Sequence, residues 1–240
     1  MYTEPTERTL GPTAPPGPVD SAPVTETAVS RTERKERTRR AILDAALELS
    51  DETSLVALSL RQVAKEVGIV PTAFYRHFES IESLGLALVD ESFTSLRAML
   101  RDVRQIDPLS AGMTPFAAIV DQSVSILAAH VHQQREHFLF IARERAAGPP
   151  AVREAIRHEI ELCERELATD LARLPVTEPW SSEDLRTLSN LIVVSMVATA
   201  EAILLAAGRP EAERQVAEQA RTQLRMVLIG ALRWRSSDRA

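Results

Sequence analysis

The residues best suited to chemistry lie close together in residues 58–78, which read LSLRQVAKEVGIVPTAFYRHF. Hydroxyl, guanidinium and imidazole groups donate or accept hydrogen bonds, so this set could read the edges of nucleic-acid bases. The residues concerned are Thr72, Ala73, Tyr75, Arg76 and His77. We expect Ser59 and Arg61, at the start of the segment, to join them in contacting DNA.

Two short helices would position these side chains. Ser59 and Gln62 have the S-x-x-Q spacing of a capping box, which begins a helix. Gly68 supplies the left-handed residue that commonly ends one. Pro71 has the fixed φ of a first helical position, so it should begin a second helix of about two turns, residues 71–77.

The second helix is expected to present its polar residues outward. Phe74 and Phe78 are four positions apart, so they share one face and should point inward. Small Ala64 and turn-forming Gly68 complete the spacing of a helix-turn-helix, whose second helix fits the DNA major groove. A preceding helix with an apolar stripe, over about residues 32–50, would complete a three-helix domain. An ordinary helical hairpin in some other all-α protein is the alternative.

This segment resembles the DNA-binding domain of the TetR (tetracycline-repressor) family. The matching residues are Ala64, Gly68, Phe74, Tyr75, His77 and Phe78. More narrowly, the chain is similar to the FabR and DesT type, TetR-family regulators of unsaturated fatty-acid synthesis. Five stretches between Arg37 and Arg235 carry this likeness: RTRRAILDAAL, LSLRQVAKEVGIVPTAFYRHF, LGLALVDES, FLFIARERA and LRMVLIGALRWR. One departure is Ile81, where many members of the family have a lysine that contacts DNA phosphate.

Six cations precede the helix-turn-helix, between residues 31 and 40. One interpretation is a solvated helix face on which Glu33 and Glu36 pair with the cations. Contact with DNA phosphates or the minor groove is favoured, because the run directly precedes the DNA-binding helices. Arg37 and Arg39 are the residues expected to make this contact.

The distribution of charge agrees with a DNA-binding end. The whole chain has a net charge of −6, whereas residues 31–78 hold nine Lys or Arg against seven Asp or Glu, a balance of +2. A mildly basic end on an acidic body suits specific DNA binding and weak non-specific binding. The single cysteine, Cys163, excludes an internal disulfide framework and fits a reducing cytoplasm, and we interpret it as a structural thiol.

The predicted fold is all-α with about nine helices, since no strand signal and no repeat is found. Residues 1–30 hold six prolines and few large apolar residues, and we expect them to be a disordered tail. Residues 31–79 would form the helix-turn-helix domain, and residues 80–240 a helical effector-binding and dimerisation domain. The fourth helix, about residues 81–104, begins at the DNA end and enters this body, so its tilt could link the two.

The last two long helices are more apolar than one buried face requires. The segment from Leu191 to Ala207 is apolar on more than one side, is interrupted by Glu201, and is short for a membrane span. With the following helix it could form a four-helix bundle with a second copy of the chain, as the resemblance also implies. The alternative is that the rest of the core covers this surface. The expected dimer residues are Leu191, Val194, Val197, Glu201, Leu224, Leu228 and Ala231.

A ligand cavity is expected inside the body. The motif FLFIARERA, residues 138–146, runs from large apolar residues straight into charges, which suits an apolar cavity with a charged mouth. A filled core with locally paired charges is the alternative, and Glu201 could border the cavity or pair across the dimer. The resemblance implies a long-chain acyl-CoA effector, with its anionic head on Arg143 or Arg145. The expected lining residues are Phe93, Met99, Phe116, Phe138, Phe140, Arg143 and Arg145.

Nothing in the sequence assembles an enzyme or a metal site. It has no Gly-rich phosphate loop, no G-x-S-x-G elbow, no C-x-x-C and no H-E-x-x-H motif. His130, His132 and His137 are wrongly spaced to chelate one ion within a regular helix, so we expect surface or loop histidines. No metal, cofactor or membrane partner is predicted.

The leading hypothesis is a homodimeric cytoplasmic repressor that binds operator DNA and responds to a hydrophobic small molecule. By resemblance, its targets would be genes of fatty-acid desaturation or synthesis. Two alternatives stay open: a drug-responsive repressor of an efflux pump, and a lipid- or acyl-binding module that uses its helix-turn-helix for protein contact.

Overall fold

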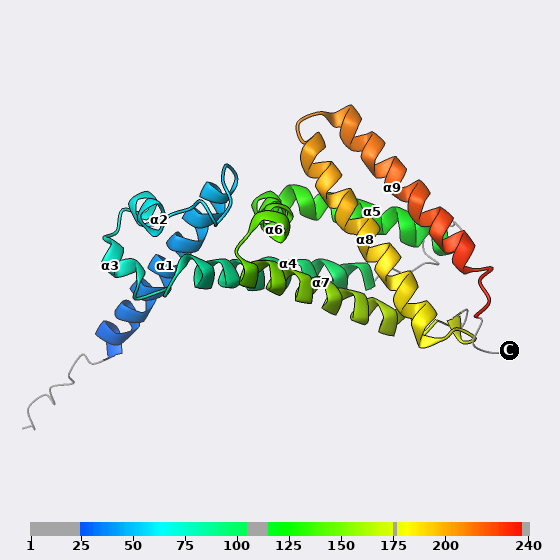
Figure 1. Cartoon of the computed structure of the whole chain (residues 1–240), viewed down its shortest axis with the longest axis horizontal. Coiled ribbons are helices and arrows are strands. Elements are labelled where there is room, and N and C mark those ends of the chain that lie inside the picture. The colour runs from blue at the N-terminus through cyan, green and yellow to red at the C-terminus, as the bar shows by residue number, and fades with distance from the viewer. Residues whose placement is uncertain (1–24, 105–114, 175–176, 237–240) are drawn as a thin grey trace, which may run out of the picture. The chain divides into compact units, whose positions relative to one another are not determined.

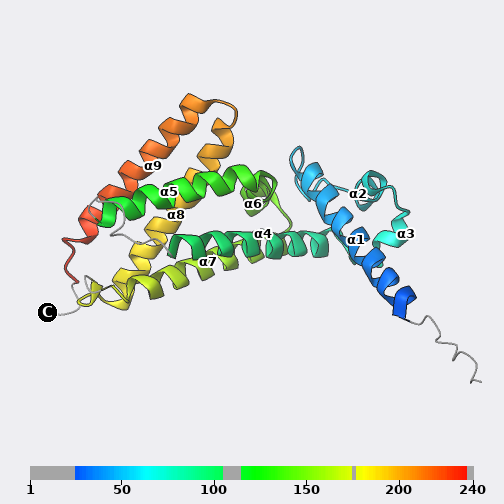
Figure 2. The ribbon, with the colours of Figure 1, turned by 180° about the vertical axis from the view of Figure 1, so that it is seen from behind.

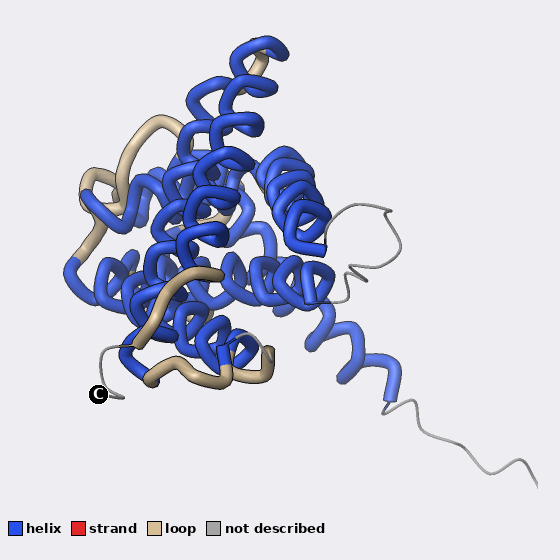
Figure 3. Tube along the Cα trace, turned by 90° about the vertical axis from the view of Figure 1, so that its right-hand side faces the viewer, coloured by secondary structure: helices blue, strands red, loops and turns tan. Residues whose placement is uncertain are grey.

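The structure, a computed structural model, describes residues 25–104, 115–174 and 177–236. Within these ranges it consists of α-helices and short connections, without a strand (Figure 1 and Figure 3). The helices are α1 (Thr25–Ser50), α2 (Leu60–Val67), α3 (Pro71–Phe74), α4 (Ile81–Arg104), α5 (Pro115–Gln133), α6 (Arg135–Ala147), α7 (Pro150–Leu171), α8 (Ser182–Ala206) and α9 (Pro210–Ala231). The predicted all-α class and the expected nine helices are confirmed in the described part of the chain.

The chain divides into two compact units, residues 1–38 and 39–240, and the division falls within α1. Helix α1 begins at Thr25, earlier than the predicted start near residue 32, because the chain after Pro23 is rich in helix formers and free of proline and glycine until the helix ends. The prediction of a disordered tail over residues 1–30 is wrong for residues 25–30, which belong to α1, and residues 1–24 lie outside the described residues. The predicted domain boundaries near residues 30 and 79 stay predictions.

Local signals set the helix-turn-helix. The side chain of Ser59 accepts the N–H of Gln62 at 3.2 Å, and the side chain of Gln62 accepts the N–H of Ser59 at 2.8 Å, which is the predicted capping box. Gly68 ends α2 at φ 74°, in the left-handed region. Pro71 begins α3 as predicted, after Val70 in an extended conformation.

Helix α3 is shorter than the two turns predicted. It ends at Phe74, and the N–H groups of Arg76 and His77 bond to carbonyls three residues back, at 3.2 and 2.8 Å. Such bonds tighten the backbone into turns that follow the helix. Thr72 and Ala73 therefore lie on the α-helix itself, whereas Tyr75, Arg76 and His77 lie on these turns.

One hydrophobic cluster joins helices α1, α2 and α3 to the body. We refer to residues 39–78, all within the second unit, as the head. The residues of the cluster with no exposed surface include Ile42 and Ala46 of α1, Val63 of α2, Phe74 of α3, Leu84 and Leu88 of α4, Phe140 of α6, and Val152 and Ile156 of α7. Head and body thus share a core, which fixes where α3 is held.

The remaining helices surround a second apolar region. Helices α4 and α7 lie side by side in both ribbon views, and α8 and α9 run antiparallel from a short turn at Gly208 (Figure 1 and Figure 2). Helix α5 packs against both α8 and α9. Ser181 caps α8 through a second capping box with Asp184.

The left-handed turn at Gly68 gives a first prediction. A Cβ at Gly68 would meet nothing within 4 Å, so Gly68→Ala should lower the free energy of unfolding by about 1–2 kcal/mol through backbone strain alone. Gly230 also has open space around it but lies in α9 without a positive φ. The control Gly230→Ala should be neutral or stabilising by up to about 1 kcal/mol. Denaturant unfolding at one protein concentration compares the two; equal effects would contradict strain at Gly68.

Candidate DNA-binding face and ligand cavity

The recognition residues of the head are largely open to solvent. Thr72, Arg76 and Tyr75 are exposed, Tyr75 by 59%. Ala73 and His77 are half-buried. Ser59 and Arg61, near the start of α2, are exposed as well. Buried Phe74 and Phe78 lie beneath them with ring centroids 5.9 Å apart.

Of the two arginines expected to contact DNA before the helix-turn-helix, Arg37 is exposed and Arg39 is not free. The Arg39 guanidinium lies 4.4 Å from the ring centroid of Phe78 and donates a long hydrogen bond of 3.5 Å to the backbone carbonyl of His77. A guanidinium over an aromatic face is held there by the electrons of the ring. Arg39 therefore positions the chain after α3, a role that sequence spacing did not reveal.

The body contains an apolar cavity of about 310 Å³. Helices α4 to α9 all contribute to its wall. Among the predicted lining residues, Phe93, Met99, Phe138 and Arg145 are in place. The Phe116 side chain lies outside the described residues. The polar or ionisable groups at the wall are Ser123, Arg145, Cys163, Asp170 and Glu201.

The structure does not bring Phe140 or Arg143 to this cavity. Phe140 is fully buried in the cluster that holds the head. Arg143 donates hydrogen bonds to the backbone carbonyls of Ser50 and Asp51 at the end of α1. Neighbouring residues on a helix differ by about 100°, so a motif of adjacent apolar residues cannot all face one cavity.

An ion pair borders the cavity. Arg145 of α6 lies 3.0 Å from Glu201 of α8, and each side chain is roughly a third exposed. Of the alternatives for Glu201, the structure places it at the cavity wall, paired within its own chain. Arg145 and Glu201 are therefore both a local ion pair and part of the cavity wall.

The predicted dimer residues divide into two groups. Leu191 and Val194 are exposed, whereas Val197, Glu201, Leu224 and Leu228 line the cavity and Ala231 is half-buried. The sequence of an all-round apolar helix does not show which side faces the core, so both sides of these helices were expected at one interface. The exposed apolar face of α8 and α9 consists of Leu191, Val194, Leu205, Met226 and Ile229.

Helix α8 is the one helix in the described part of the chain that is long and apolar enough to cross a membrane. Length and composition alone are weak evidence, because a helix at the core of a protein has the same character. About a third of its most apolar window is buried within the chain (33%). Part of the helix closes the cavity wall, and the remainder belongs to the exposed face of α8 and α9.

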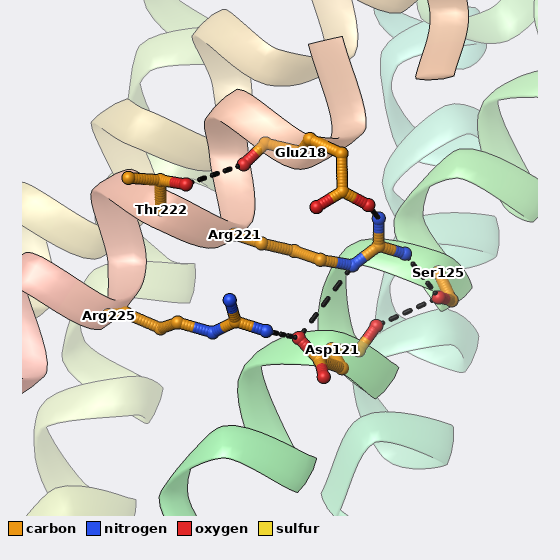
Figure 4. Close-up of polar contacts among 6 residues, drawn as sticks. All are labelled: Asp121, Ser125, Glu218, Arg221, Thr222 and Arg225. Carbon is orange, nitrogen blue, oxygen red and sulfur yellow. Dashed lines mark hydrogen bonds and ion pairs between the residues drawn. The ribbon is translucent and has the colours of Figure 1, made fainter. Parts of the chain in front are cut away.

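A polar network fastens α9 to α5 beside the cavity (Figure 4). Asp121 of α5 accepts a hydrogen bond of 2.5 Å from Arg225 of α9 and lies 3.8 Å from Arg221. Arg221 also bonds Ser125 at 3.0 Å and Glu218 at 2.9 Å. Two guanidiniums from one helix thus converge on a single carboxylate of the other, which holds the two helices in register.

Two titratable residues of α6, His137 and Glu144, lie in surroundings that the sequence alone does not reveal. Burial lowers the pKa of His137, whose Nδ1 lies 2.9 Å from the Ser92 hydroxyl, so the expectation of a surface histidine is wrong here. Burial also raises the pKa of Glu144, which is fully buried. Among the described residues, no group of His, Cys, Asp or Glu is arranged to hold a metal ion.

Residues 42–88 match the family model described as bacterial regulatory proteins, tetR family. The fold is similar to solved regulators. A transcriptional regulator from Rhodococcus sp. Rha1 has a TM-score of 0.58 and 22% identity over 82% of this chain and 96% of its own. GusR of Salmonella enterica has a TM-score of 0.60 and 20% identity, over 80% of this chain and 96% of its own. SmeT, solved as a complex with triclosan, has a TM-score of 0.59 and 19% identity, over 81% of this chain and 91% of its own.

The family match falls on the helix-turn-helix, and the solved structures, all under 25% identical, extend the likeness to the fold of the body. The family match and the shared fold both agree with the resemblance to the TetR family. They do not distinguish the FabR and DesT type from other members.

The exposed recognition residues give a second prediction. A Tyr75→Ala, Arg76→Ala double variant should lose discrimination between operator and unrelated DNA by about 1–3 kcal/mol per lost base contact. Arg37→Ala should instead weaken binding to all sequences and lower the salt dependence. Selection from a random DNA library measures the discrimination, and titration with DNA at several salt concentrations measures the effect of Arg37→Ala, each with Arg157→Ala on the exposed face of α7 as the control. A double variant that selects the wild-type sequences would contradict this face.

Proposed function

We propose that this chain is a homodimeric transcriptional repressor whose affinity for operator DNA is changed by a hydrophobic small molecule. The observation that carries the proposal is an apolar cavity of about 310 Å³ in the same chain as an exposed recognition segment. A cavity of this size is at the lower end of those that bind small ligands. As a DNA-binding regulator, it would act in the cytoplasm.

The effector proposed first is a long-chain acyl-CoA, and the regulated genes those of fatty-acid desaturation or synthesis. The resemblance to the FabR and DesT type and the aromatic and aliphatic wall of the cavity support this choice. Arg145 would meet the anionic head, since Arg143 already binds the carbonyls of Ser50 and Asp51.

A drug-responsive repressor of an efflux pump is the second candidate. It is favoured by one specific observation: SmeT, which shares the fold, was solved with triclosan, a small and largely apolar molecule. A ligand of this kind has no anionic head that needs a cationic partner, so it could bind without opening the Arg145–Glu201 ion pair. A lipid-binding module without DNA affinity is a third possibility, which any operator-binding measurement addresses.

Dimerisation would use the exposed apolar face of α8 and α9. Leu205, Met226 and Ile229 are exposed by 79, 69 and 60%, and exposed apolar residues that gather into one patch commonly mark an interaction surface. Two such helical hairpins facing each other would form a four-helix bundle. Each chain has one recognition segment, so a dimer would present two to successive half-sites of an operator.

The third prediction tests this interface. Val194→Glu or Ile229→Glu should yield monomers, because a carboxylate buried between two apolar faces would have no partner. Operator affinity should fall with dimerisation. Leu86 is an exposed leucine of α4, outside the proposed interface, so the matched control Leu86→Glu should stay dimeric. Sedimentation over a range of concentrations measures both; a wild-type chain that is monomeric at micromolar concentration would rule out the interface.

The fourth prediction tests the effector. Saturated or unsaturated long-chain acyl-CoA added to the protein–operator complex should change operator affinity by at least about fivefold, the lower range of useful coupling. Arg145→Gln should weaken this response while leaving any response to triclosan intact. If triclosan acts and no acyl-CoA does, the efflux-type function replaces the fatty-acid function.

A further inference from the structure

The half-buried ring of His137, near the start of α6, contacts α4 with both of its nitrogens. Nδ1 lies 2.9 Å from the hydroxyl oxygen of Ser92, and Nε2 lies 3.5 Å from a carboxylate oxygen of Glu91. The side chain is 15% exposed, so neighbouring protein groups supply most of its hydrogen bonding. Histidine is the side chain whose charge ordinarily changes between about pH 5 and 8, so the protonation state of this ring matters to its neighbours.

The hydrogen bonds around the ring are completed by a second proton. The hydroxyl of Ser92 donates to the backbone carbonyl of Leu88 at 2.7 Å. A neutral imidazole has one N–H group, which it can donate to Ser92 or toward Glu91. If it donates toward Glu91, Ser92 has to leave Leu88 in order to donate to Nδ1. A protonated ring has an N–H for each partner, and Ser92 keeps its bond to Leu88.

The carboxylate that faces His137 also ties the head to α4. Glu91 accepts a hydrogen bond of 2.6 Å from Arg40 of α1, and the same oxygen, Oε1, faces the ring. Arg40 in turn donates to Asp44, one turn along α1, at 2.8 Å. Among the described residues, Glu91 is the one carboxylate within ion-pair distance of the ring. Arg40 can therefore exchange Glu91 for Asp44, whereas the ring has Glu91 alone.

The charges around the ring come from three helices. They are Glu91 of α4, Arg40 and Asp44 of α1, and Glu136 of α6 itself. Burial lowers the pKa of His137 from its ordinary value of 6.5, and Arg40 lowers it further, while the three carboxylates raise it. The ring is thus neutral at neutral pH and takes up its proton under acidic conditions. One cation then becomes two, facing the same three carboxylates.

We propose that His137, Glu91 and Arg40 form a proton switch at the junction of α1, α4 and α6. When the ring takes up a proton, Glu91 pairs with the ring and Arg40 is left with Asp44. The head then loses a polar tie to α4. The consequence for DNA, a lower operator affinity in acid, rests on the proposed function, whereas the exchange of partners does not.

The switch also sets how stability depends on pH. A ring whose pKa is lowered by folding binds a proton less readily in the folded chain than in the unfolded one. The free energy of unfolding should therefore fall as the pH falls through 6.5, and the loss should stop once the folded ring is protonated. His137→Gln should remove this part of the pH dependence, and His158→Gln, an exposed histidine of α7, should keep it.

The first test needs no DNA. A double-mutant cycle of Arg40→Gln and Glu91→Gln, measured by denaturant unfolding, gives the coupling between the two side chains. The coupling should be present at about pH 8 and lost where NMR shows the His137 ring to be protonated. In a His137→Gln background it should persist at both pH values. A coupling that survives beside a protonated ring, or a ring that stays neutral down to about pH 5, would overturn the switch.

The second test measures operator affinity between about pH 8 and the pH at which the ring is protonated. The wild type should lose about two- to fivefold more than His137→Gln, the range for one partly exposed ion pair. The other histidines are common to both proteins, so the difference isolates His137. His158→Gln should match the wild type. Glu91→Gln should have the lower affinity already at about pH 8, and thermal unfolding checks that every variant is folded.

The outcomes separate the switch from the proposed function. If the wild type and His137→Gln lose the same operator affinity in acid, the switch does not act on DNA and fails, while the proposed function stands. If the wild type selects no DNA sequence, the proposed function fails and the cycle decides the switch. A coupling lost only beside a protonated His137 then supports it, and a coupling that does not change with pH overturns it.

Discussion

Phe74 on the recognition helix and Phe140 on α6 belong to the same buried cluster, and the rest of the structure depends on that shared core. Burying a side chain of this size stabilises the fold by about 1.5–3 kcal/mol, so separating the head from the body would expose several such groups at once. Packed interiors tend to shift between discrete arrangements and do not deform continuously. A ligand that regulated such a molecule would have to move the helices of the head and the body together, with their shared contacts kept.

The parts of the fold that the sequence predicted are those fixed by a few neighbouring residues. The Ser59–Gln62 box, the left-handed Gly68 and the Pro71 start depend on backbone groups within four positions, and all three were predicted. The length of α3 was not, because the chain after Phe74 tightens where it meets the core under Phe78.

The errors in the candidate sites have a common physical origin. Phe138 and Phe140 are both large and apolar, and only the position of the neighbouring helices decides which of them faces the cavity. The same holds for Val194 and Val197, one exposed and one at the cavity wall. The buried hydrogen bond between Glu144 and Leu55 joins residues 89 positions apart, so no local sequence pattern predicts it.

Electrostatics leave the cavity open to more than one ligand chemistry. The Arg145–Glu201 pair is partly exposed, and such pairs contribute roughly 1 kcal/mol or less. An anionic group could take Arg145, and a cationic group could take Glu201, each at the modest cost of opening this pair. The apolar wall then sets the size and shape of the molecule, while the pair sets little more than the position of its polar end.

The guanidinium that closes α1 has a consequence for synthesis of the chain. Arg143 lies 93 residues after Ser50, so the end of α1 is completed only when α6 has been made and packed. During translation helices α1 to α3 are synthesised first, and the carbonyl of Ser50 lacks this hydrogen-bond donor until Arg143 has been added. A chain released early, before residue 143, carries the whole recognition segment but lacks the contacts that hold its first loop. The end of α1 and the loop after it therefore depend on residues that are synthesised much later in the chain.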